Sequence, residues 1–247
     1  MSQLVKDLAK GLRLPYVKQN IDLHLEQARI ENKSYEDFLS EILQYETEMR
    51  NQNGVRNRVK RAKFPYRKTL DELVVNELPD AAQNQFQNLR SLDFIKNNQN
   101  IIMSGNPGTG KTHLAIGLGI KACQMGYNVH FAHVPDLIIE LKEAKNERTL
   151  GRLKDRFERF ELIILDQLGY ISFDKEGAEL LFNLISARTE HASTIFTTNM
   201  SFERWEEIFH DPVLTAAMVD RITHKSFVIN MNGQSYRMKQ TGDLLNR

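Results

Sequence analysis

The chain has 247 residues, of which 41% are hydrophobic and 26% charged, and its formal net charge is +1. This composition allows one large domain or a compact domain with a smaller appendage, and a single cysteine, Cys123, excludes an intramolecular disulfide. Because no run of about 18 apolar residues and no apolar signal region occur, we expect no membrane-spanning helix and a soluble, intracellular protein.

Residues 1–52 have the pattern of a small helical domain. Ile21, Leu25 and Ala28 recur near helical spacing, and Ser34 precedes an acidic residue, Asp37, by three positions, as in a capping box. Because so short a bundle is marginally stable alone, we interpret it as a docking or DNA-binding module attached to a larger domain.

Residues 53–68 follow as a basic linker. Between positions 56 and 68 it holds cations and no acid. The cations are Arg56, Arg58, Lys60, Arg61, Lys63, Arg67 and Lys68. Such a run is typical either of a solvated linker or of a surface that neutralises nucleic-acid phosphates without reading sequence.

Residues 69–247 predict an α/β domain. Residues 69–98 have few strand signals and should form a helical lead-in, after which short apolar strands alternate with helices, as in a parallel sheet. The expected strands are Asn100–Ser104, Val129–Ala132, Leu162–Leu165, Thr194–Thr197 and Phe227–Asn230. The expected helices are Lys111–Met125, Asp136–Lys145, Leu150–Phe160 and Glu176–Arg188.

A complete P-loop pattern lies between the first strand and the first helix of this domain. The loop consists of Gly105, Asn106, Pro107, Gly108, Thr109, Gly110, Lys111 and Thr112. Its glycines let backbone N–H groups turn toward phosphates, and the helix directs its positive dipole end at them. We expect ATP here, with Lys111 on the β- and γ-phosphates, the Thr112 hydroxyl on Mg²⁺, and His113 as a further contact.

Asp166 follows four apolar residues at the carboxyl end of a buried strand, which is where ligands of α/β proteins bind. We interpret it as the Walker B acid that holds the Mg²⁺ shell together with Thr112. His130 and His133 are three positions apart without a cluster of acids or cysteines, so they predict no metal site of their own.

The residue after Asp166 is Gln167. ATPases of this type usually have a glutamate here that polarises the attacking water. A glutamine can hydrogen-bond but cannot take up a proton, so we expect ATP binding with crippled hydrolysis. Two explanations remain open: a Glu→Gln change made to trap ATP, which we favour, or a natural variant that uses ATP as structural glue.

Asn199 follows the fourth expected strand and could orient the attacking water. It could equally cap the helix that follows.

Together, the P-loop, the Leu162–Gln167 strand, Thr197–Asn199, Asp220–Arg221 and Ser235–Arg237 resemble AAA+ ATPases of the DnaC/IstB group. The connector sequence from Lys60 to Leu70 and the N-terminal helical segment look especially similar to IstB, the helper ATPase of one insertion-sequence family. The resemblance covers nearly the whole chain and implies a prokaryotic cytoplasmic protein.

This resemblance implies a five-stranded parallel sheet of order 5-1-4-3-2, with ATP between neighbouring subunits of a homo-oligomer. Arg221 matches the arginine finger that reaches the γ-phosphate of the adjacent subunit, and Arg237 matches the sensor-2 arginine. Only 48 residues follow Asn199, which is too few for a full AAA+ helical lid.

IstB-like proteins bind double-stranded DNA and cooperate with a transposase, which implies both partners for this chain. The basic linker is one candidate DNA surface, and Lys142, Lys145 and Arg148 are another, unless they only complement a helix end. Two rival functions stay open: a DnaC-like helicase loader that binds single-stranded DNA, and a nucleotide-dependent scaffold that never turns over.

Overall fold

The computed structural model describes residues 2–239; the end of the expected ATPase domain, residues 240–247, lies outside the described residues. The chain divides into two compact units, Met1–Asn57 and Arg58–Arg247. No helix among residues 2–239 is long and apolar enough to cross a membrane.

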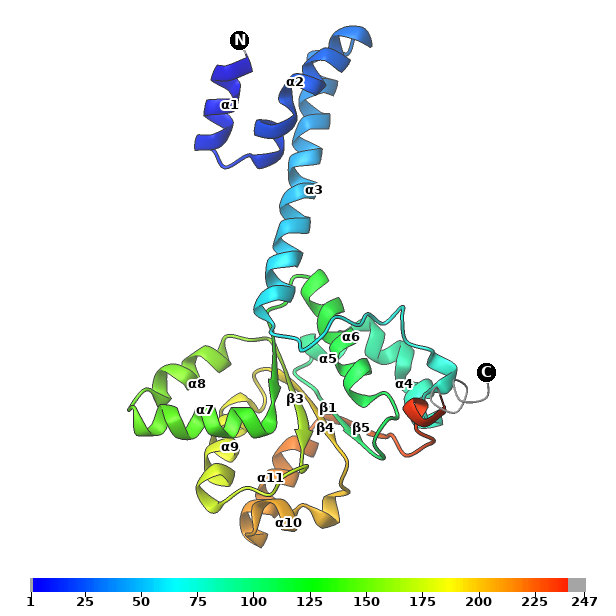
Figure 1. Ribbon diagram of the computed structural model, residues 1–247, viewed down its shortest axis with the longest axis vertical. Coiled ribbons are helices and arrows are strands. Elements are labelled where there is room, and N and C mark those ends of the chain that lie inside the picture. The colour runs from blue at the N-terminus through cyan, green and yellow to red at the C-terminus, as the bar shows by residue number, and fades with distance from the viewer. Residues whose placement is uncertain (1, 240–247) are drawn as a thin grey trace. The chain divides into compact units, whose positions relative to one another are not determined.

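Unit 1 is helical, as the apolar spacing predicts. It contains α1 (Ser2–Gly11), α2 (Pro15–Ile30) and most of α3 (Tyr35–Arg61) (Figure 1). The α3 N-terminus has the predicted cap, because the Asp37 N–H donates to Ser34 Oγ at 3.1 Å. Residues 53–61, expected as part of a linker, are instead helical, since α3 continues to Arg61.

A buried carboxylate holds the start of α2. Glu46 on α3 is only 3% exposed, and its Oε2 accepts hydrogen bonds from the Tyr16 and Val17 N–H groups at 2.8 and 3.1 Å. The first N–H groups of a helix lack partners inside the helix, so a negative charge there satisfies donors and complements the dipole. The apolar core of the unit is small and consists of Ala9, Val17, Ile21 and Ile42.

Unit 2 is built around a five-stranded, all-parallel sheet of order β2-β3-β4-β1-β5. The predicted order 5-1-4-3-2 is therefore confirmed. The strands are β1 (Asn100–Ser104), β2 (Val129–His133), β3 (Leu162–Leu168), β4 (Ser193–Thr198) and β5 (Ser226–Asn230).

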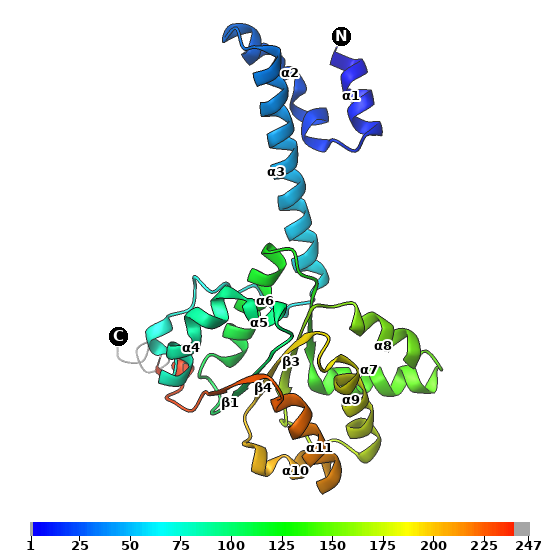
Figure 2. The ribbon, with the colours of Figure 1, turned by 180° about the vertical axis from the view of Figure 1, so that it is seen from behind.

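Helices cover both faces of this sheet, so that the strands are buried on both sides and read as continuous apolar runs. On β1, Ile101 and Met103 enter one core while Ile102 enters the other. The first core includes α4 (Asp80–Ser91), α5 (Asp93–Lys96) and α6 (Lys111–Gln124), preceded by η1 (Val75–Glu77). Figures 1 and 2 show this group of helices on one side of the strands.

The second core lies against the opposite face of the sheet. It includes α7 (Val134–Asn146), α8 (Leu150–Glu158), α9 (Lys175–Arg188), α10 (Glu206–Phe209) and α11 (Pro212–Thr223), with η2 (Phe202–Arg204) before α10. The carboxyl ends of β1, β3 and β4 meet at one edge, where the sequence predicts the nucleotide.

Candidate nucleotide-binding site

The P-loop turns between the end of β1 and the first residue of α6. The C-terminal segment packs directly on it: the Asn106 N–H donates to Asn232 Oδ1 at 3.1 Å, and the Tyr236 N–H donates to the Gly108 carbonyl at 3.1 Å. Gly108 has a φ of +82°, and a Cβ there would lie 2.2 Å from Ser235 Oγ. Glycine is therefore needed at this position both for the backbone turn and for the close approach.

Lys111 lies folded inside the loop and is 6% exposed. Its Nζ donates to the carbonyls of Gly105 and Asn106 at 2.5 and 2.6 Å. Burial lowers the pKa of Lys111 to about 8, the Asp166 carboxylate opposes this shift, and Arg237 adds to it. A poorly hydrated ammonium held by two neutral carbonyls is ready to exchange them for phosphate oxygens.

Asp166, at the end of β3, accepts two hydroxyl hydrogen bonds on Oδ1. Thr112 Oγ1 donates at 2.9 Å and Thr197 Oγ1, from β4, donates at 2.6 Å. The two expected metal ligands, Thr112 and Asp166, are therefore adjacent. A hydroxyl and a carboxylate oxygen beside a phosphate loop suit Mg²⁺, which takes few protein ligands and fills its octahedron with phosphate and water.

Gln167 occupies an irregularity of β3, where the register with β4 shifts between Leu165 and Leu168. Its φ is +65°, a left-handed conformation that costs a non-glycine residue about 1–2 kcal/mol. Two contacts hold this conformation. The Gln167 N–H donates to Thr197 Oγ1 at 3.0 Å, and Gln167 Oε1 lies 2.6 Å from His133 Nε2, at the end of β2.

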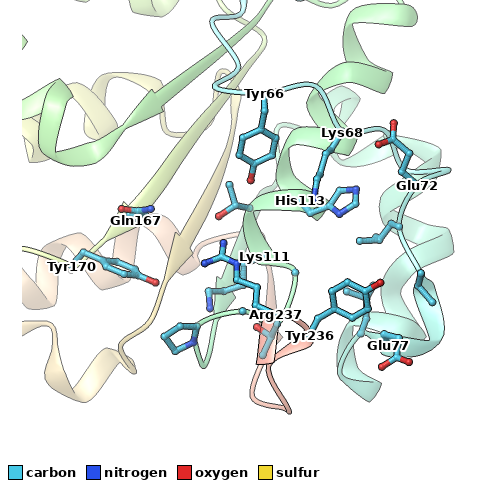
Figure 3. A pocket seen from close by; sticks show the side chains of 18 residues that line it. Tyr66, Lys68, Glu72, Glu77, Lys111, His113, Gln167, Tyr170, Tyr236 and Arg237 are labelled. Carbon is cyan, nitrogen blue, oxygen red and sulfur yellow. The ribbon is translucent and has the colours of Figure 1, made fainter. Parts of the chain in front are cut away.

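A cavity of about 450 Å³ opens beside the P-loop, within the size range of ligand sites (Figure 3). The cations Lys68, Lys111 and Arg237 line it, while Leu73, Val74 and Leu78 supply apolar surface. The other lining residues are Tyr66, Glu72, Glu77, Pro107, Gly108, Thr109, Gly110, Thr112, His113, Gln167, Tyr170 and Tyr236. Cations around the phosphate loop and an apolar wall suit a nucleoside triphosphate.

Of the other expected nucleotide residues, His113 and Arg237 line the cavity. His113 Nε2 lies 3.0 Å from the Thr69 carbonyl, so its ring also holds the chain before α4. Asn199 and Arg221 are exposed and are not among the lining residues. The Arg221 guanidinium lies 5.0 Å from the Phe182 ring centroid.

The cations of the basic linker occupy different environments. Arg58 Nε donates to the Cys123 carbonyl at 2.8 Å, and Lys68 lines the nucleotide cavity. Lys68 is nevertheless exposed, as are Arg56, Lys60, Arg61, Lys63 and Arg67.

The second expected DNA surface is partly neutralised by α9 and the residue before it. Lys142 pairs with Asp174 and Lys145 with Glu176, both at 2.6 Å, whereas Arg148 is exposed.

Sequence reasoning did not single out Tyr66, Thr197 or His133 as site residues. The signal for Thr197 and His133 was their position at the ends of strands on either side of β3, because carboxyl ends of neighbouring parallel strands meet. No local pattern marks Tyr66, since it reaches the cavity only through the packing of the chain before α4.

Comparisons with known proteins find relatives that are named as ATP-binding proteins. A family model described as IstB-like ATP binding protein matches residues 7–243. The chain is 38% identical to the insertion sequence IS21 ATP-binding protein of Pseudomonas aeruginosa, covering 94% of this chain and 88% of that protein. It is 35% identical to the insertion sequence IS5376 ATP-binding protein of Geobacillus stearothermophilus, covering 97% and 96%.

Solved structures resemble the fold. They include DnaA of Aquifex aeolicus bound to AMPPCP (TM-score 0.58, 16% identity, 74% of this chain and 55% of that chain). Another is DnaI (TM-score 0.56, 20% identity, 68% and 90%). At these identities the likeness concerns the AAA+ P-loop fold alone. The family match spans both units and the complete P-loop, and the chain belongs to the IstB-like ATP-binding proteins associated with insertion sequences.

Proposed function

We propose that this chain binds ATP and Mg²⁺, assembles as a homo-oligomer on double-stranded DNA, and assists the transposase of its insertion sequence. The observation that carries the proposal is the complete nucleotide site, Lys111 with Thr112 and Asp166, in a chain whose relatives are insertion-sequence ATP-binding proteins. In the ATP-bound protein, the Thr112 hydroxyl and Asp166 hold the Mg²⁺, and Lys111 and Arg237 bind phosphates.

DNA binding is supported by the exposed cations that surround the end of α3. Lys60, Arg61, Lys63 and Arg67 follow one another closely and no acid lies among them. Such cations contact phosphates, which gives affinity without sequence preference. Assembly of several subunits repeats the same cations along the duplex and multiplies the affinity.

A binding titration tests this proposal. With ATP and Mg²⁺, the chain should bind a labelled duplex more tightly than a single strand of equal length, and omission of ATP should weaken binding. In the triple variant Arg61→Gln, Lys63→Gln and Arg67→Gln, the dependence of log affinity on log salt should become shallower by about 0.9 per lost phosphate contact. A matched variant removes three cations elsewhere, at Lys10, Lys154 and Lys225.

Preference for the single strand would overturn the proposal and favour a helicase loader. An equal loss in both triple variants would show that net charge, rather than this surface, binds DNA. The role in transposition is read from strand transfer by the element's own transposase, which should rise when the ATP-bound chain is added.

A further inference from the structure

The segment 62–70, called the strap below, connects α3 to the rest of unit 2 and is packed rather than loose. The Phe131 N–H, on β2, donates to the Ala62 carbonyl at 2.8 Å, and the Phe64 ring meets the Phe131 ring edge-on at 6.3 Å. Ala62 and Leu70 are buried. Both ends of the strap are therefore anchored.

Two glycines within α6 allow the strap to pack closely against this helix. A Cβ at Gly117 would lie 2.6 Å from Leu70 Cδ2, and one at Gly119 would lie 2.8 Å from Phe64 Cε1. A glycine inside a helix lowers stability by about 1 kcal/mol relative to alanine. The close approach of the strap explains why α6 has glycine at these two positions despite that loss. Because α6 is also the helix that follows the P-loop, the strap has a defined position relative to the phosphate site.

Between its anchors, the strap places two side chains in the nucleotide cavity. Tyr66 and Lys68 line it, whereas the intervening Arg67 does not, although all three side chains are partly open to solvent. Figure 3 shows Tyr66 and Lys68 on the side of the cavity opposite Arg237 and Tyr236. Lys68 Nζ lies 5.8 Å from the Tyr66 ring centroid.

Both side chains interact electrostatically with other residues of the site. Burial raises the pKa of Tyr66, the Asp166 carboxylate raises it further, and Arg237 opposes the shift. Lys68 contributes, after burial, to the lowered pKa of His113, in the first turn of α6. The Thr69 carbonyl, next to Lys68 in the chain, lies 3.0 Å from His113 Nε2, so the backbone at Lys68 passes beside the first turn of α6, the end of the helix that favours phosphates.

We propose that Tyr66 and Lys68 are nucleotide-binding residues: Lys68 contacts the phosphates nearer the ribose, and the Tyr66 hydroxyl donates to the terminal phosphate. This inference rests on the proposed binding of ATP. Lys68 then belongs to the ATP site and not to the DNA surface. Because Lys63 and Arg67 lie on the same strap, ATP also holds these DNA-facing cations in place.

Nucleotide titrations of the full chain test the assignment. In Lys68→Gln, the dissociation constants of ATP and ADP should both rise about tenfold, because a charge-assisted hydrogen bond is lost. In Tyr66→Phe, the constant for ATP should rise about threefold and that for ADP should not change, because only the neutral bond to the terminal phosphate is lost. Lys154→Gln, on α8 and outside the cavity, is the control for loss of one charge.

The outcomes separate the possible explanations. If Lys68→Gln binds ATP as the unchanged chain does and loses affinity for the duplex instead, Lys68 is a DNA contact and the inference fails. If the unchanged chain binds neither nucleotide, the proposed function fails as well. Lys68→Arg keeps the charge and should retain ATP affinity. If Lys68→Gln and Lys68→Arg both lose ATP affinity while their melting temperatures without nucleotide are unchanged, the charge of Lys68 does not bind the phosphates and the inference fails.

Discussion

At the scale of single residues, the expected impairment of ATP hydrolysis depends on Gln167. Its amide is held by His133, and its backbone N–H by Thr197, which also donates to Asp166. The side chain therefore has a defined place beside the Mg²⁺ ligands, although an amide cannot accept a proton from water. The proposed consequence is a site that binds ATP but lacks a base for its hydrolysis.

Gln167→Glu should raise the rate of phosphate release from ATP by about 10²–10⁴-fold, the usual contribution of general base catalysis. The measurement is steady-state phosphate release at saturating ATP and Mg²⁺. Gln124→Glu, at the exposed end of α6, adds the same charge and should leave the rate unchanged. An unchanged rate in Gln167→Glu would show that this position does not lack a base.

The site residues that the sequence predicts are those that belong to a local sequence pattern. Lys111 and Thr112 belong to a contiguous loop, and Asp166 ends an apolar strand, so local pattern was sufficient. Tyr66 could not be recognised in this way, since only the packing of the strap on α6 brings it to the cavity. The basic run predicts Lys68 as a DNA contact, and a run read in one dimension does not show that this side chain lines the cavity, which the proposed nucleotide contact depends on.

At the scale of elements, the positions of the five strands were predicted to within three residues, because buried parallel strands are short apolar runs bounded by polar residues. The connector was predicted less well. Asn53 and Gly54 are typical helix breakers, yet α3 runs through them to Arg61. Glycine within a helix costs about 1 kcal/mol, which one long helix can offset through its remaining hydrogen bonds.

The glycines of α6 give a prediction at this scale. Gly119→Ala should destabilise the chain by about 1–3 kcal/mol despite its better helix propensity, because the added methyl group overlaps Phe64 and Ile164 Cδ1 at 2.8 Å. Gly151→Ala on α8 is the matched control, since its Cβ would meet nothing within 4 Å. It should stabilise the chain by about 0.5–1 kcal/mol.

Urea denaturation measures both variants through the free energy of unfolding. If Gly119→Ala were as stable as Gly151→Ala, the strap would not be packed against α6 as described. Loss of nucleotide affinity in Gly119→Ala at temperatures where it stays folded would show in addition that the strap contributes to the cavity wall.

At the scale of the whole molecule, one cavity contains most of the expected ATP residues but not all of them. Lys111, Thr112 and Arg237 line it within unit 2, whereas Arg221 is exposed on α11 beside Phe182 and lines no part of that cavity. An arginine that does not line the nucleotide cavity of its own chain can still contact the phosphates bound to a neighbouring subunit. This arrangement supports the proposal that ATP lies at the interface between subunits.

Mixing two inactive variants tests that proposal. In the Gln167→Glu background, Arg221→Ala retains its cavity but cannot supply the finger, and Lys111→Ala supplies the finger but cannot bind phosphates. Each alone should release phosphate at less than about a tenth of the parent rate, since an arginine finger contributes roughly 10³-fold or more. Equal mixtures should recover activity, because some interfaces then combine an intact cavity with an intact Arg221.

The control is Arg204→Ala, an exposed arginine paired with Glu207, which should keep the parent rate alone and should not rescue Lys111→Ala beyond the sum of the two. If mixtures of the Arg221 and Lys111 variants also stay at the sum of their separate rates, Arg221 does not act between subunits. Full activity of Arg221→Ala by itself would remove it from the catalytic set altogether, leaving its stacking on Phe182 as its role.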